Sequence, residues 1–195
     1  FFHGFFILIF FLLGSHLIEL IPNTSLAAML ITVGIKLAHP KEFVHTFKIG
    51  KEQLLIFLVT IFFTIYDDLL IGIGAGIVLK MVIHLINGVP VSSLFKAAMK
   101  VEQVGEVHVV KIFKSAVFTN YLGIKNCLDG LPKGATVRID LSQTKLVDHS
   151  VMESLHHFQH EYEGTGGHVE IQGLEDHRPV SEHEFAARKN VSVVV

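Results

Sequence analysis

The chain of 195 residues has one cysteine, Cys127, and few charged residues. A single cysteine excludes a disulfide framework and a zinc cluster built from several cysteines. Charged residues make up 17% of the chain, against roughly 25% in an average soluble domain, while 50% of the residues are hydrophobic. This composition excludes a disordered chain and a coiled coil. The 16 basic residues are balanced by 18 acidic ones, so the chain lacks the positive field that binding a nucleic-acid backbone requires.

Charge is distributed unevenly along the chain. Residues 1–90 contain no arginine, five lysines and five acidic residues, whereas residues 91–195 hold the other eleven basic and thirteen acidic residues. This asymmetry predicts a membrane part, residues 1–88, followed by a soluble part, residues 89–195. The turn-forming residues Asn87-Gly88-Val89-Pro90 mark the boundary between them.

Four apolar segments are predicted in the membrane part, at residues 1–21, 26–37, 54–66 and 69–86. The first has no charge before Glu19 and, at about 1.5 Å per residue, is long enough to cross about 30 Å of hydrocarbon. The second is too short to span a bilayer alone. Because the chain starts inside a hydrophobic run without an initiator methionine or a basic leader, we expect it to be part of a longer protein.

The pair Asp67-Asp68 separates the last two segments. A continuous helix would bury both carboxylates in hydrocarbon, which is costly, so the sequence predicts a hairpin with the pair at a water-facing turn. The lysines of residues 36–51 predict a polar loop on the cytoplasmic side, and the end of the last segment falls on that side too. The chain is therefore expected to be an integral protein of the plasma (inner) membrane with a cytoplasmic carboxyl-terminal domain.

Gly72 and Gly76 form a G-x-x-x-G pair within the last apolar segment. Such pairs let helix backbones approach closely in lipid, and we assign them to helix packing. The glycine-rich stretch also resembles a phosphate loop superficially, but no Lys-Ser or Lys-Thr follows it.

The soluble part alternates strand-like and helical patterns, which predicts an α/β fold with some parallel strand pairing. One helical face is predicted to carry Val151, Leu155, Phe158 and Tyr162. Strands are predicted at residues 107–113, 136–141 and 168–171, and helices at 119–128 and 150–162. A short helix is also predicted around 182–188, and 191–195 has a strand-like composition.

Motifs in both parts are similar to those of known families. Residues 139–142 (IDLS) and 146–150 (LVDHS) resemble the core signature of a STAS domain, which anti-sigma-factor antagonists share with the cytoplasmic tails of SulP anion transporters. Four stretches resemble the closing helices of a SulP (sulphate permease type) membrane domain. They are Phe2-His3-Gly4, the Ile21-Pro22 turn before Leu26-Ala27-Ala28, Gly34–Pro40, and Asp68-Leu69-Leu70-x-Gly72.

This resemblance implies the last four segments of a fourteen-segment inverted-repeat transporter, followed by a STAS domain. It implies secondary transport of an inorganic anion, of the sulphate or bicarbonate class, by alternating access. The anion would lie between two half-helices upstream of Phe1, so no substrate-binding residue is assigned here. The implied partners are the lipid bilayer, the anion, a coupling cation and a second copy of the chain, with no cofactor and no enzymatic activity.

The loop Asp148-His149-Ser150 departs from the pattern of the anti-sigma antagonists. In those proteins a phosphorylated serine directly follows the aspartate, whereas here His149 does and Ser150 stands one position later. We therefore expect Asp148 or Ser150 to cap the following helix. A regulatory or partner-contact role for the three residues is a second hypothesis.

Two rival functions stay open at the level of sequence. The first is a membrane-anchored STAS signalling or interaction module without transport activity. The second is a metal-dependent enzyme, since Glu153, His156 and His160 share one helical face. The H-E-x-x-H pattern is absent, so a solvated polar face is the preferred interpretation and no metal site is assigned. Neighbouring residues in the 148–150 loop cannot orient one another as a catalytic triad.

Overall fold

The computed structural model describes residues 2–19, 22–37 and 39–191. Contacts divide the chain into two compact units, Phe1–Val44 and His45–Val195. The division predicted at residues 88 and 89 stays a prediction, because the last long helix packs against the α/β domain that follows it.

The first unit holds α1 (Phe2–Glu19), α2 (Asn23–Leu37) and the start of α3 (Pro40–Ile49). The prediction of a polar loop over residues 36–51 is wrong for α3. Proline is favoured at the first helical position, and Phe43 and Phe47 recur at helical spacing among the lysines. Residue 21 of the predicted Ile21-Pro22 turn lies outside the described residues.

One helix within the described ranges, α5 (Leu69–Ile86), is long and apolar enough to cross a membrane, with a mean hydropathy of 2.3. A shorter apolar stretch, Phe2–Gly14, lies in α1. The four predicted apolar segments correspond to the helices α1, α2, α4 and α5, but the prediction that all four are membrane segments is not confirmed.

The helices α4 (Lys51–Tyr66) and α5 form a hairpin that breaks at Asp67-Asp68, where the sequence predicts a turn. The Asp68 carboxylate caps α5 by accepting a hydrogen bond of 2.8 Å from the Ile71 N–H. Gly72 and Gly76 are buried and face Thr64 and Thr60 of α4. The packing role of these glycines remains a prediction, and their contact with α4 provides the means to test it.

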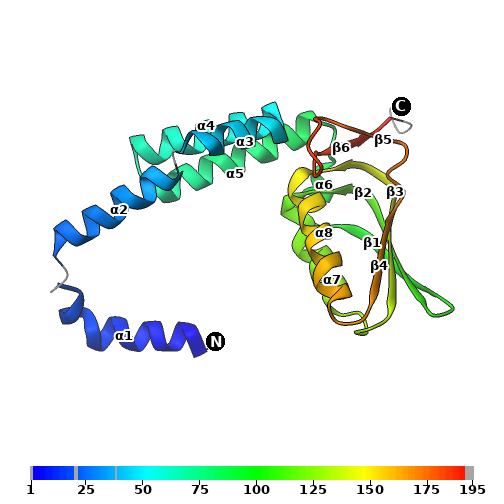
Figure 1. Ribbon diagram of the computed structural model, residues 1–195, viewed down its shortest axis with the longest axis horizontal. Helices are drawn as coiled ribbons and strands as arrows, with labels where there is room; N and C mark the ends of the chain where they lie inside the picture. Colours follow the sequence, from blue (N-terminus) through cyan, green and yellow to red (C-terminus); the bar gives the residue numbers. More distant parts are fainter. Residues whose placement is uncertain (1, 20–21, 38, 192–195) are drawn as a thin grey trace. The chain divides into compact units, whose positions relative to one another are not determined.

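Residues 91–191 form a mixed α/β domain in which α7 (Tyr121–Asp129) and α8 (His149–Glu163) cover one face of the sheet (Figure 1). The strand order is β1-β2-β3-β6-β5, and β4 also pairs with β3. The β2–β3 and β3–β4 pairs are parallel, as predicted, and the others are antiparallel. The remaining elements are α6 (Val91–Phe95), the 3₁₀ helix η1 (Phe118–Asn120), β1 (Ala98–Val104), β2 (Val107–Ala116), β3 (Thr136–Val147), β4 (His168–Gln172), β5 (His177–Pro179) and β6 (Arg188–Asn190).

The core lies between the sheet and the two helices. Alternate residues of β3, among them Val137, Ile139 and Leu141, point into it and are fully buried. The predicted face of α8 is confirmed, since all four of its apolar residues are buried. The helix predicted at residues 119–128 is confirmed, since η1 and α7 together cover this range; Leu122 within it is exposed.

The carboxyl-terminal segment is not helical over residues 182–187, which corrects that prediction. Two backbone N–H groups of this segment bond to nearby side chains: the His183 N–H to Ser181 Oγ and the Phe185 N–H to His183 Nδ1. Local hydrogen bonds of this kind compete with helix formation. The chain then enters β6. Most of the strand-like stretch at 191–195 lies outside the described residues.

The α4–α5 contact predicts opposite effects at neighbouring glycines. A Cβ on Gly72 would overlap the Thr64 hydroxyl and approach the Thr60 carbonyl to 2.8 Å, so Gly72→Ala should destabilise the hairpin by about 1–3 kcal/mol. Gly74 on the same helix has open space, so Gly74→Ala should stabilise α5 by up to about 1 kcal/mol. Melting temperatures of the detergent-solubilised protein measure both. Equal shifts of the same sign would contradict the packing role.

Candidate functional site

Asp148 lies where β3 ends and α8 begins, and its carboxylate is almost completely buried at 2% exposure. Oδ1 accepts a hydrogen bond of 2.8 Å from the Val151 N–H, which caps α8 as the sequence suggested. Oδ2 accepts a second bond of 2.8 Å from the Phe118 N–H of η1. The carboxylate therefore joins two chain segments that are 30 residues apart in the sequence.

The last turns of α5 bring two basic side chains to the same carboxylate. Lys80 Nζ lies 3.4 Å and His84 Nε2 lies 3.3 Å from Oδ2 of Asp148. The residues are four apart, so both project from one face of the helix. Neither ring nitrogen of His84 has a well-formed hydrogen bond within the described ranges, and the contact with Asp148 is an ion pair only when the imidazole is protonated.

The electrostatics of this cluster favour an ionised carboxylate. Burial raises the pKa of Asp148, but the His84 imidazole, the Lys80 ammonium group and the two N–H donors outweigh burial and hold the pKa below its ordinary value of 3.8. A buried charge of this kind is tolerated only with such partners. The cluster thus fixes the end of α5 to the start of α8.

The other two residues of the predicted loop lie on either side of Asp148. Ser150 Oγ accepts a hydrogen bond of 2.8 Å from Lys80 Nζ, so it shares its cation with Asp148. His149 faces the carboxyl-terminal segment instead, with Nδ1 2.7 Å from the Phe185 carbonyl oxygen. The structure therefore brings Asp148 and Ser150 to one site and His149 to another. A regulatory role for the loop remains a hypothesis.

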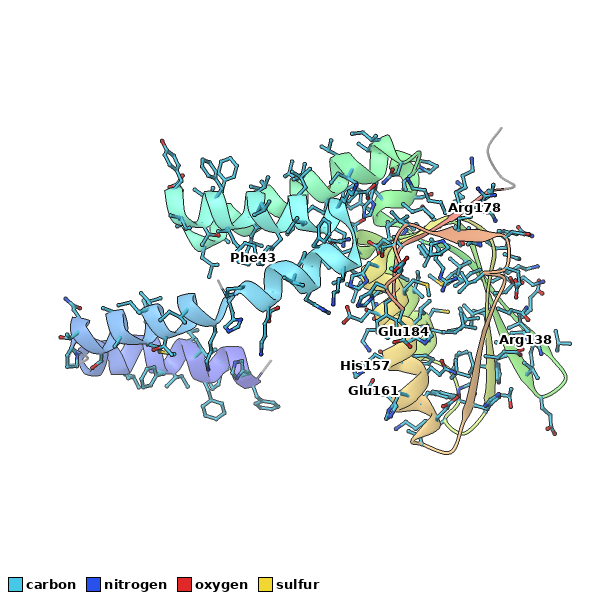
Figure 2. The ribbon with its side chains drawn as sticks, turned by 45° about the horizontal axis from the view of Figure 1, so that its top comes forward. Phe43, Arg138, His157, Glu161, Arg178 and Glu184 are labelled. Atoms are coloured by element: carbon cyan, nitrogen blue, oxygen red, sulfur yellow. The ribbon has the colours of Figure 1, made fainter. Side chains whose placement is uncertain are left out.

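Histidines from three segments meet around His183. Its ring centroid lies 5.6 Å from those of both His45 and His149. No group of three His, Cys, Asp or Glu side chains among residues 2–19, 22–37 and 39–191 is arranged to hold a metal ion. On the outer face of α8, His157 and Glu161 form an exposed pair at 3.3 Å (Figure 2). Of the predicted polar face, Glu153 and His160 are exposed, whereas His156 is half-buried with its ring 5.1 Å from that of Phe185.

Lys80 and His84 belong to the site, although they are not among the residues predicted for it. The available signal was their spacing, since they are the two basic residues of an otherwise apolar helix and lie four positions apart. Charged residues in such a helix usually have partners, so the pair indicates a carboxylate nearby. No local pattern connects them to Asp148, which lies more than 60 residues further along the chain.

Comparison with known proteins finds a family similar to the amino-terminal region. Residues 1–60 match the model of the sulfate permease family. No curated protein sequence matches the chain. The resemblance inferred from the closing helices is therefore confirmed over these residues, which are similar to a membrane transporter family.

Solved structures give weaker likenesses. The STAS domain of an anti-sigma-factor antagonist from Rhodobacter sphaeroides is 17% identical, with 46% of this chain and 98% of that chain covered and a TM-score of 0.33. The murine Slc26a9 anion transporter in the inward-facing state is 14% identical, with 70% and 25% covered and a TM-score of 0.34. The crystal structure of Mglu is 19% identical, with 39% and 19% covered and a TM-score of 0.37. The chain thus spans about a quarter of the length of the murine transporter.

Neutralising the buried carboxylate should weaken the domain and its attachment to α5. Asp148→Asn retains the size and the capping oxygen but leaves Lys80 without its anion, and we expect a loss of about 3 kcal/mol in the free energy of unfolding. Asp148 is stabilising while ionised, because its pKa is lowered in the folded state. The difference between wild type and variant should shrink as the pH falls below 3.8, the ordinary pKa, because the carboxylate is then protonated.

The matched control is Asp129→Asn, which removes an exposed partner of Lys125 at 3.2 Å and should cost at most about 1 kcal/mol. Urea unfolding of the protein in detergent, followed by circular dichroism across the pH range, measures both variants. If the two variants lost equal stability, or if the Asp148→Asn difference did not change in acid, the assigned role of the cluster would be wrong.

Proposed function

We propose that the protein serves secondary transport of inorganic anions of the sulphate or bicarbonate class, by alternating access. The observation that carries the proposal is the match of residues 1–60 to the sulfate permease family. Transport by alternating access requires membrane segments that move relative to one another around an anion site. By the family resemblance, that site belongs to segments other than the four in this chain, and the present residues join the membrane domain to a STAS domain.

Lys80, His84, Asp148 and Ser150 are together called the Asp148 cluster. In this proposal the cluster rigidly connects the membrane domain of the transporter to its α/β domain. Lys80 and His84 belong to the last membrane helix, and Asp148 and Ser150 belong to the first turn of α8. A hydrogen bond of 2.7 Å from Lys189 to the Asn87 side chain and one of about 3.3 Å from Asn87 to Glu52 extend the same junction to β6 and α4. The α/β domain is thereby positioned to regulate transport or to mediate a homodimer, and a coupling cation belongs to the same proposal.

The rival proposal, a membrane-anchored signalling module, does not require these contacts between α5 and the α/β domain. An anchor holds a domain at the membrane through any apolar helix. It does not need buried side chains that fix the helix and the domain at one angle, nor glycines closely packed against a second helix. These contacts support the transporter interpretation.

Uptake into liposomes tests the function directly. The polypeptide that carries the anion-site segments together with residues 1–195 should accumulate labelled sulphate when reconstituted, and unlabelled bicarbonate should compete if both belong to its substrate class. Asp148→Asn should reduce the rate of uptake, whereas Asp129→Asn should leave it at the wild-type value. Uptake no greater than that of protein-free liposomes would leave the anchored module as the better interpretation.

Cysteine labelling tests the proposed orientation. After replacement of Cys127 by serine, single cysteines at Lys41 and Asp67 should react with a membrane-impermeant maleimide from opposite sides of sealed vesicles, because the lysine-rich segment lies inside and the Asp pair outside. A cysteine at Glu106, in the turn between β1 and β2, should react from the same side as position 41. Labelling of positions 41 and 67 from one side would refute this orientation.

A further inference from the structure

The α/β domain lies beside the membrane helix rather than beyond its end. The whole of α5, 18 residues, measures about 27 Å at about 1.5 Å per residue, close to the roughly 30 Å of a hydrocarbon core. Lys80, which contacts Asp148, lies only about 16 Å from the Asp68 end of the helix. If α5 crosses the membrane, its contact with the domain lies inside the bilayer boundary and not in the surrounding water.

The side of α5 that faces away from Asp148 remains apolar along this stretch. Val82, Leu85 and Ile86 are exposed, although Lys80 and His84 beside them are buried against the domain. A helix that left the membrane at Lys80 would expose these three side chains to water. The apolar composition therefore continues past the contact, as it does in a helix that stays in lipid to its end.

The domain carries exposed apolar side chains next to this contact. Val91 and Phe95 lie one helical turn apart on α6, Phe118 lies on η1 and Leu122 on α7; these four residues are called the apolar rim. Phe95 is 68% exposed and Leu122 is 67% exposed. Phe95, Phe118 and Leu122 line one side of a cavity of about 550 Å³, and the other residues that line it include the polar Ser150 and Glu153 of α8. Contiguous exposed apolar surface of this kind marks a contact site.

Two contacts fix the depth of the apolar rim relative to α5. Lys80 Nζ lies 5.0 Å from the centroid of the Phe118 ring, and the Phe118 N–H is bonded to Asp148. Val78, an exposed apolar residue of α5, precedes Lys80 by two residues, or about 3 Å along the helix axis. Phe118 therefore lies at the level where α5 still presents apolar side chains to its surroundings.

We propose that the apolar rim inserts into the interfacial region of the lipid leaflet beside α5. The inference rests on the proposed membrane placement of α5, and it identifies the bilayer as a direct partner of the α/β domain. Aromatic and aliphatic side chains on one face of short helices are what the boundary between headgroups and acyl chains accepts. Lys96, which is exposed directly after Phe95, suits the adjoining headgroup region, where a lysine keeps its charge in water.

The chain contains no tryptophan, so a single introduced tryptophan reports on one position. Phe95→Trp and Leu122→Trp place the reporter on the apolar rim, where both native side chains are exposed and substitution leaves the core intact. The whole chain is reconstituted in phosphatidylcholine liposomes whose acyl chains carry bromine near the glycerol end. Bromine quenches tryptophan on contact, so both variants should lose fluorescence relative to the same protein in unbrominated lipid.

Two further variants separate the possible results. Val78→Trp lies on the apolar side of α5 and should be quenched wherever α5 is in lipid. Val104→Trp, 62% exposed at the tip of the β1–β2 hairpin and remote from α6 (Figure 1), should keep its fluorescence. Quenching of the rim reporters and of Val78→Trp, but not of Val104→Trp, supports the inference.

Each other result overturns it in a distinguishable way. Quenching of Val78→Trp alone would show that α5 is in lipid while the apolar rim is not. A blue-shifted, unquenched emission from the rim reporters would then mean that protein covers it, and a red-shifted emission would mean that water does. Absence of quenching in all four variants would refute the membrane placement of α5 itself. Equal quenching of Val104→Trp would mean that the domain binds lipid without specificity.

Discussion

The structure of the second unit depends on one buried carboxylate that must stay ionised. Asp148 has two N–H donors and two basic side chains around it, and each comes from a different place: α8, η1 and two positions of α5. Removing any one of these partners exposes the remaining charge to a low-dielectric environment, where it is costly. The end of α5, the start of α8 and the 3₁₀ turn η1 are consequently held in one arrangement rather than in a series of similar ones.

Much of the fold could be predicted from the sequence, because the patterns that determine these elements are local. The apolar spacing of α8, the break at Asp67-Asp68 and the cap at Asp148 each depend on residues within a few positions of one another. The two wrong predictions, at α3 and at residues 182–188, arose where other features hid or replaced the local pattern. The lysines of residues 36–51 concealed the apolar spacing of α3, and side-chain hydrogen bonds at Ser181 and His183 replaced the helix expected near them.

The candidate site was only half predictable. The loop at 148–150 stands out as a helix start, so its capping role follows from sequence alone. Its partners Lys80 and His84 lie in a segment that composition assigns to a different part of the protein. A contact over such a distance depends on how the β3 strand is placed beside β2, and no short pattern encodes that placement. Leu122 shows the same limit, because spacing alone cannot distinguish a core position from an exposed apolar one.

The strand β3 also connects β6, near the carboxyl end of the second unit, with the Asp148 cluster. Its last two residues, Leu146 and Val147, pair with Lys189 and Arg188 of β6 and are followed immediately by Asp148. Lys189 also bonds to Asn87 at the end of α5. The strand β6 therefore contacts both β3, which leads into Asp148, and the end of α5, which carries the basic partners of Asp148. A partner that bound β6 would therefore contact a segment directly connected to both sides of the Asp148 cluster.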